Sequence, residues 1–171
     1  MAASARTAVV IVASTSAAEG STTDATGPVI AQWLGDRGWA VREPVVVADG
    51  APVESALRAA IAEQASVVIT TGGTGLSADD LTPEATRAVV DREVPGLAEE
   101  LRRRGAAHTP LALLSRGTAG VAGHTLIVNL PGSTGGVRDG LDVLEQVLDH
   151  AVDVLTGPVD HGRAGGVDPK M

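Results

Sequence analysis

Short runs of β-branched residues, separated by helical patterns, constrain the fold of this chain more than any other feature. Each run is short, bounded by turn residues and mostly apolar, as expected for strands buried on both faces. Such strands alternating with helices are typical of a parallel sheet with right-handed crossovers. We expect strands at residues 7–13, 41–48, 66–71 and 125–130, and helices at 28–37 and 52–64 between the first three strands.

The second half of the chain adds a local departure from this alternation. Two short helices are expected at residues 83–90 and 96–104, and residues 115–132 look like an antiparallel strand pair around a glycine-containing turn. Apolar residues then recur at threes and fours from Val137 to Leu155, which predicts a long helix with one apolar stripe. The predicted fold class is α/β, a three-layer, mostly parallel sheet with helices on both faces and a local antiparallel strand pair.

Composition limits the size and nature of the core. The chain has 171 residues, no Phe or Tyr and two Trp, so its core must be aliphatic. That length suits one ordinary domain, which we place at residues 1–156. Residues 157–171 carry almost no apolar side chains and are expected to form a flexible C-terminal tail.

Charge and cysteine content exclude several classes of function. A net charge of −8 argues against the broad basic surface of nucleic-acid-binding proteins, so no nucleic-acid partner is expected. The only lysine is Lys170, and there is no cysteine, so a catalytic lysine within the fold, thiol catalysis and cysteine-ligated metals are excluded. No stretch approaches 18 consecutive apolar residues, and we expect a cytoplasmic protein with no membrane partner.

The most informative segment is TTGGTGLSADDLTPEAT at residues 70–86, where a buried strand runs into a glycine loop. Glycines there allow backbone N–H groups to form an anion-binding concavity, although a tight turn without a ligand is the alternative. A P-loop is excluded because Leu76 follows Gly75, where that motif needs lysine. A dinucleotide-binding fingerprint is disfavoured because residues 77–82 separate the glycines from the helix that Pro83 begins.

Acidic residues stand near this loop at two places. Asp79 and Asp80 follow the glycines, and Asp49 follows the second predicted strand, so its side chain is expected at the same sheet edge. A carboxylate beside a phosphate cradle suits Mg²⁺, which prefers one or two carboxylates together with phosphates and water. The plainer alternatives are a solvated acidic turn at Asp79 and Asp80 and a turn residue at Asp49.

A second glycine segment, NLPGSTGG at residues 129–136, also follows a strand and precedes a helix. Pro131, Gly132 and Ser133 could present donors to an anion there, and a plain helix-entry loop is the alternative. Ser115 and Arg116 have a weaker claim, since Arg116 could be an ordinary surface charge. The four histidines show no ligand spacing, so no zinc site is expected.

Taken together, TTGGTGLSADDLTPEAT, DREVPGLAEELR, SRG at 115–117 and NLPGS resemble the MogA/MoaB proteins of molybdenum-cofactor biosynthesis. The resemblance extends from about residue 8 to residue 155. It implies a molybdopterin-binding α/β domain that forms a homotrimer. In active members, it implies adenylyl transfer from Mg·ATP to molybdopterin with release of pyrophosphate, ahead of a molybdenum-insertion protein.

The resemblance also assigns roles to individual residues. Asp49 and Asp80 match the family's two essential aspartates and would hold Mg²⁺ and position the reacting phosphates. The pterin- and nucleotide-binding residues would be Thr71, Gly72, Gly73, Thr74, Gly75, Ser115, Pro131, Gly132 and Ser133. The chain departs from many relatives at Thr15 and Ser16, where they carry Asp-Arg, and at Thr134 and Gly135 within the second glycine segment, where they often carry Pro-Lys. A non-catalytic molybdopterin-binding or scaffold paralogue is therefore the alternative function.

Overall fold

The computed structural model describes residues 5–157, and its centre is a seven-stranded sheet with the order β2-β1-β4-β7-β6-β5, in which β3 also pairs with β1. The pairs among β1, β2, β3, β4 and β7 are parallel, whereas β5, β6 and β7 pair in antiparallel fashion. The strands are β1 (Thr7–Ala13), β2 (Ala40–Val41), β3 (Val45–Val47), β4 (Val67–Thr71), β5 (Arg92–Glu93), β6 (Ala119–Ala122) and β7 (Thr125–Leu130).

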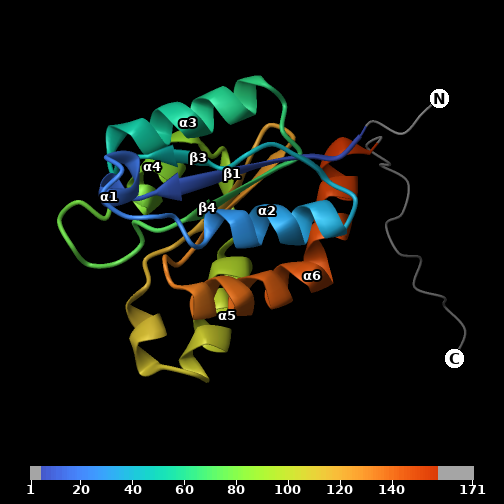
Figure 1. The fold of residues 1–171 in the computed structure, drawn as a ribbon. Coiled ribbons are helices and arrows are strands. Elements are labelled where there is room, and N and C mark those ends of the chain that lie inside the picture. The colour runs from blue at the N-terminus through green and yellow to red at the C-terminus, as the bar shows by residue number, and fades with distance from the viewer. Residues whose placement is uncertain (1–4, 158–171) are drawn as a thin grey trace, which may run out of the picture.

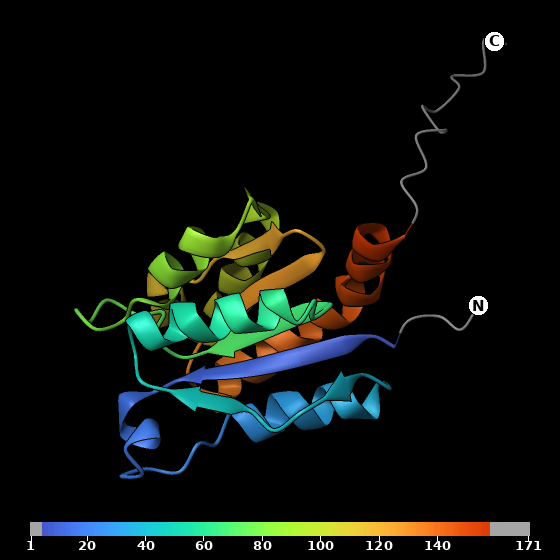
Figure 2. The same ribbon diagram turned by 90° about the horizontal axis from the view of Figure 1, so that it is seen from above.

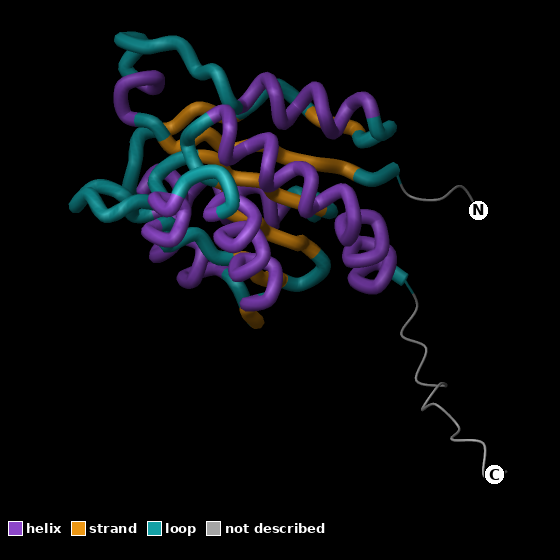
Figure 3. The backbone as a smooth tube through the Cα atoms, turned by 90° about the horizontal axis from the view of Figure 1, so that it is seen from below, coloured by secondary structure: helices purple, strands orange, loops and turns teal. Residues whose placement is uncertain are grey.

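Helices cover both faces of this sheet, which gives three layers (Figures 1 and 3). One face is covered by α3 and α4, and the other by α2, α5 and α6. The helical elements are α1 (Thr15–Ala18), α2 (Gly27–Asp36), α3 (Ala51–Ala62), α4 (Thr82–Val89), α5 (Pro95–Ala106), the 3₁₀ helix η1 (Pro110–Leu114) and α6 (Thr134–Thr156). The predicted fold class is confirmed.

The core divides into two aliphatic clusters, one on each side of the sheet. Successive strand residues point to opposite faces, so Val10 packs with α2 and α6 while Ile11 packs with α3. The longest helix supplies a complete buried stripe, formed by Val137, Leu141, Leu144, Leu148 and Val152. This stripe packs against the sheet, mainly on β7, the strand that ends at the second glycine segment.

The second half of the sheet follows the sequence prediction. β6 and β7 form the predicted antiparallel pair, joined through Gly123, whose φ of +58° suits the tight turn between them. β1 and β7 have the predicted bounds.

The prediction of one strand over residues 41–48 is wrong. Two short strands, β2 and β3, stand there, and the segment between them contains Pro44. A proline has no N–H to donate to a ladder, so the β-branched run does not continue through it. The elements α1, β5 and η1 were not predicted, because each is too short to show an apolar period.

The two ends of the described chain lie close together (Figure 2). Arg6, just before β1, forms ion pairs with Asp149 and Asp153 of α6 at 2.7 Å. Of the predicted tail, only Gly157 falls within the described residues, so the prediction for residues 158–171 lies outside them. Between residues 5 and 157, no helix combines the length and the apolar character needed to cross a membrane.

Candidate functional site

A cavity of about 900 Å³ opens at the carboxyl ends of β4 and β7. These neighbouring parallel strands end level with each other, since Thr71 pairs with Leu130. The glycine loops that follow them therefore leave the sheet side by side, and a Cβ on Gly132 would lie 3.4 Å from the Cα of Gly72. The opposite wall is formed by apolar side chains of α5 and η1, including Ala98, Leu101, Leu111, Ala112 and Leu114.

Most of the residues predicted from sequence line this cavity. They are Gly72, Gly73, Thr74, Gly75, Asp80, Ser115, Pro131, Gly132 and Ser133. Thr71 and Asp49 do not line it. The Thr71 side chain is fully buried, and its hydroxyl donates to the carbonyl of Pro131 at 2.8 Å. Thr71 therefore ties the end of β4 to the second glycine loop.

Both loops line the cavity and contain backbone N–H groups without a hydrogen-bond partner in the described part of the chain. The N–H groups of Gly73, Thr74 and Gly75 donate to no group among residues 5–157, and the same holds for Gly132 and Ser133. Gly72 and Gly73 have φ of +88° and +66°, a conformation that only glycine adopts readily. Consecutive free N–H groups in such a turn form an anion-binding concavity. The cavity thus has two neighbouring sets of donors suited to phosphate.

Asp80 places its carboxylate directly against the first loop. Its Oδ2 accepts a hydrogen bond from Ser77 N at 3.0 Å and would lie 2.7 Å from a Cβ on Gly75. Any larger residue at Gly75 would displace that carboxylate. Asp80 is half-buried and lines the cavity, whereas neighbouring Asp79 is exposed and does not.

Asp49 contacts the same loop at a different residue. Its Oδ2 accepts from the N–H and the hydroxyl of Thr15, at 3.1 and 3.0 Å. Its Oδ1 would lie 3.0 Å from a Cβ on Gly73. The same Cβ would lie 2.3 Å from Oγ1 of Thr82, a buried hydroxyl that has no hydrogen-bond partner among residues 5–157. The structure therefore brings Asp49 and Asp80 to one loop, at Gly73 and Gly75, but only Asp80 faces the cavity.

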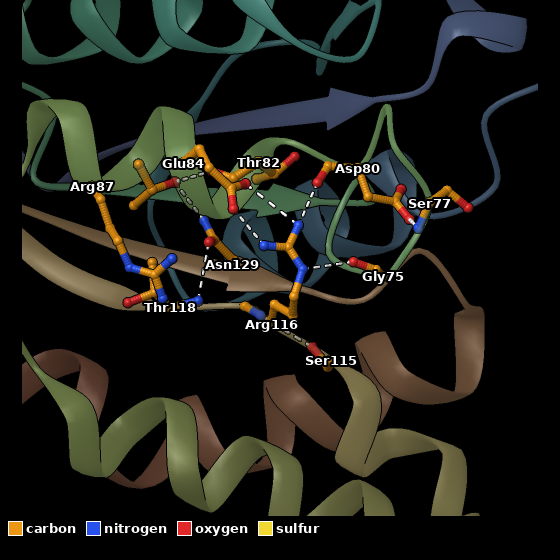
Figure 4. A network of polar contacts seen from close by, with 12 residues as sticks. Gly75, Ser77, Asp80, Thr82, Glu84, Arg87, Ser115, Arg116, Thr118 and Asn129 are labelled. Carbon is orange, nitrogen blue, oxygen red and sulfur yellow. Dashed lines mark hydrogen bonds and ion pairs between the residues drawn. The ribbon is translucent and has the colours of Figure 1, made fainter.

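Arg116 is not an isolated surface charge, the alternative that its sequence context allowed, because its guanidinium contacts three other residues. Its Nε donates to the carbonyl of Gly75 at 2.9 Å, its Nη2 donates to the carbonyl of Asp80, and both terminal nitrogens contact the Glu84 carboxylate (Figure 4). The hydrogen bond from Arg116 lowers the pKa of Glu84, and the same bond raises the pKa of Arg116. Only its place within the SRG motif could have drawn attention to Arg116 in the sequence.

Charged side chains near the mouth of the cavity were also missed. Arg102 Nη1 donates to the carbonyls of Ser115 and Gly117, at 3.3 and 2.8 Å. Arg138, in the first turns of α6, is exposed, lines the cavity and forms no ion pair within the described part of the chain. His108 Nδ1 lies 3.0 Å from Asp139 Oδ2, and both line the cavity. These residues are spread over α5, α6 and the turn that follows α5, so no local pattern connects them.

No group of three or more His, Cys, Asp or Glu side chains between residues 5 and 157 could hold a metal ion. Of the four histidines, His161 lies outside those residues.

Comparison with known proteins places this site in context. A family described as "Probable molybdopterin binding domain" matches residues 9–150. The solved structure of the molybdopterin biosynthesis Mog protein from Mycobacterium ulcerans is 57% identical, with a TM-score of 0.86 over 88% of this chain and 99% of that one.

Curated relatives share the similarity over part of their length. A molybdenum cofactor biosynthesis bifunctional protein from Synechococcus elongatus is 37% identical over 93% of this chain and 50% of its own length. A molybdopterin adenylyltransferase from Haemophilus influenzae is 40% identical over 66% of this chain and 57% of its own length. The chain thus spans about half the length of the curated relatives it matches.

Proposed function

The chain belongs to the MogA/MoaB family of molybdenum-cofactor biosynthesis proteins, and on that basis we propose that it transfers an adenylyl group from ATP to molybdopterin. The observation that carries the proposal is the cavity in which two sets of free backbone N–H groups stand beside the Asp80 carboxylate. Its volume lies within the range of small-molecule pockets, roughly 300–1,000 Å³. Curated relatives named molybdopterin adenylyltransferase support the same activity.

In this reaction an oxygen of the terminal phosphate of molybdopterin attacks the α-phosphorus of ATP. A new P–O bond forms, the bond to pyrophosphate breaks, and AMP is joined to the pterin phosphate. The protein needs no nucleophile for this step, only alignment and compensation of charge. The N–H groups of Gly73, Thr74 and Gly75 would hold one phosphate, and those of Gly132 and Ser133 would hold a second one.

The remaining parts of the cavity suit the rest of the two substrates. The apolar wall of α5 and η1 offers Leu101, Leu111 and Leu114 to a flat ring system. Arg138 and the N-terminal end of α6 add positive potential at the mouth, which favours anionic ligands despite the net charge of −8.

Mg²⁺ is implied by the use of ATP, and the available donors fit it. Mg²⁺ usually binds one or two carboxylates together with phosphate and water, so it needs no cluster of three protein ligands. Asp80 would hold it from the cavity side. The Asp49 carboxylate would assist from its position beside Gly73, where the Thr82 hydroxyl, without a partner among the described residues, also lies. Bound there, the ion would offset the negative charge of the polyphosphate.

The position of Asp49 favours one alternative, a non-catalytic molybdopterin-binding or scaffold protein. Asp49 is held by Thr15 and does not line the cavity, so the two carboxylates do not both face the same ligand space. In that case molybdopterin would bind without reacting.

The two functions are separated by incubating the protein with molybdopterin, ATP and Mg²⁺ and measuring adenylylated product and pyrophosphate. We expect Asp80→Asn to lower kcat by about a hundredfold while the melting temperature stays close to that of the wild type. Asp79→Asn is the matched control, because Asp79 is adjacent but exposed and outside the cavity. Equal rates for the two variants would contradict the role of Asp80, and binding without product would indicate the scaffold.

Assembly and location belong to the same proposal. A homotrimer would cover exposed apolar side chains that do not line the cavity, such as Leu113 of η1, which is 63% exposed. Sedimentation equilibrium tests the trimer directly. We place the protein in the cytoplasm, where its product would pass to a molybdenum-insertion protein.

A further inference from the structure

The loop that carries Asp80 is attached to the rest of the protein at very few points. At its base, Gly72 N donates to Leu130 O and Thr82 N donates to Gly73 O. Residues 74–80 lie between these bonds. Within them, Ser77 and Asp80 are joined by two hydrogen bonds, from Asp80 N to Ser77 O and from Ser77 N to Asp80 Oδ2.

Within the described part of the chain, every hydrogen bond between residues 74–80 and another segment comes from Arg116. Its backbone N–H donates to Thr74 O at 2.8 Å, its Nε to Gly75 O at 2.9 Å, and its Nη2 to Asp80 O. One residue thus reaches both ends of the loop segment (Figure 4). A loop with four exposed residues in a row, 76–79, would otherwise be free to move.

Arg116 is itself held from two sides. Glu84, in the first turn of α4, accepts from both terminal nitrogens of the guanidinium and so sets the plane of the group. Arg102 of α5 donates to the carbonyls of Ser115 and Gly117, the residues on either side of Arg116. Contacts with Glu84 and Arg102, which lie outside residues 74–80, therefore hold both the side chain of Arg116 and the backbone around it.

We propose that Arg116 is a positioning residue for Asp80: its guanidinium, oriented by Glu84, holds residues 74–80 so that the Asp80 carboxylate faces the cavity. This inference rests on the proposed function, because it names what keeps that site in its binding geometry. Arg116 is not among the residues that line the main cavity, so it acts through the loop and not on the ligand.

The chemistry of the guanidinium is specific to this role. Its planar fork gives fixed donor directions, and here it satisfies two carbonyls and one carboxylate together. A lysine ammonium has three donors on a flexible stem and cannot hold the same three acceptors in one plane. A glutamine has only two N–H donors and no charge. We therefore expect residues 74–80 to be held best by Arg, less well by Lys and least well by Gln at this position.

The experiment compares wild type, Arg116→Lys, Arg116→Gln and Glu84→Gln, with Arg103→Gln as the matched control. Arg103 also pairs with a glutamate, Glu100, but is exposed on α5 and does not line the cavity. Two measurements are made on each protein. One is the kcat and KM of adenylyl transfer, and the other is hydrogen exchange at the amides of Ser77 and Asp80.

For Arg116→Gln we expect kcat to fall by about ten- to a hundredfold, as for a misplaced site, with KM for ATP changed by less than about threefold. Exchange at Ser77 and Asp80 should be about tenfold faster, while exchange in β4 and β7 stays as in the wild type. Arg116→Lys should have kcat and exchange rates between those of the wild type and Arg116→Gln. Glu84→Gln should change both quantities in the same direction as Arg116→Gln, and Arg103→Gln should match the wild type.

Two results would overturn the inference. One is unchanged exchange at Ser77 and Asp80 in Arg116→Gln. The other is faster exchange throughout β4 and β7 with parallel losses of kcat and melting temperature, which marks a purely structural residue. If the wild type shows no transfer, the proposed function fails, and the exchange measurement alone then decides whether Arg116 holds the loop.

Discussion

Substituting alanine for Gly72 should destabilise the protein through two effects that the structure separates. Gly72 has φ of +88°, and a left-handed backbone costs an alanine about 1 kcal/mol relative to glycine. The added Cβ would also lie 2.4 Å from the backbone oxygen of Ala13. Because that contact is with backbone in a central strand, it cannot be relieved by a side-chain rotation, and overpacking of this kind costs about 1–3 kcal/mol more.

A control variant isolates the first effect. Gly20 has φ of +79°, close to that of Gly72, but an alanine Cβ there would meet nothing within 4 Å. Gly20→Ala should therefore lower the free energy of unfolding by about 1 kcal/mol, and Gly72→Ala by about 2–4 kcal/mol. For a chain of this length, the second value corresponds to a melting temperature lower by roughly 4–16 °C.

The measurement is urea denaturation followed by circular dichroism, with m-values compared to check that only stability changed. If Gly72→Ala costs no more than Gly20→Ala, the close approach of Gly72 to Ala13 does not constrain the loop. In that case the glycine would be required for its backbone conformation alone.

Two further predictions concern the polar contacts around the site. The Arg116 hydrogen bond lowers the pKa of Glu84 below its ordinary value of 4.5, so the pair stabilises the folded state fully above that pH and less as the pH falls through the folded pKa. The difference in unfolding free energy between wild type and Glu84→Gln, measured by urea titrations at a series of pH values, should therefore shrink on acidification. A difference that grows on acidification would refute this prediction. Asn129 is buried and accepts from Thr118 N at 3.1 Å, so Asn129→Leu should cost about 3 kcal/mol. Gln146→Leu, which removes an amide from the exposed face of α6, should cost under about 0.5 kcal/mol, and similar losses for the two variants would contradict the role of the buried amide.

Prediction of the fold from sequence succeeded where the local pattern was distinct. β1 and β7 could be located because each is a short, nearly continuous apolar run, and α6 because its apolar residues recur at threes and fours. It failed over residues 41–48, where the β-branched run is broken around Pro44. It also could not find α1, β5 or η1, since one or two turns or a two-residue strand carry no period.

The candidate site, too, could be predicted only in part from the sequence. The glycine loops could be recognised because each follows a buried strand and precedes a helix, and such loops bind anions through their own backbone. The partners of their side chains could not be recognised. Arg116 reaches Gly75 and Asp80 across separations of 41 and 36 residues, and Thr15 reaches Asp49 across 34.

The sequence by itself determined the kinds of element and the conformations open to each loop, because strand, helix and left-handed glycine preferences act within a few residues. Only the tertiary structure decided that β4 lies between β1 and β7, and therefore that two glycine loops share a cavity that Asp80 lines and Asp49 does not. The physical reason is that strand order depends on how whole helices and strands pack together. No short stretch of the chain contains that information.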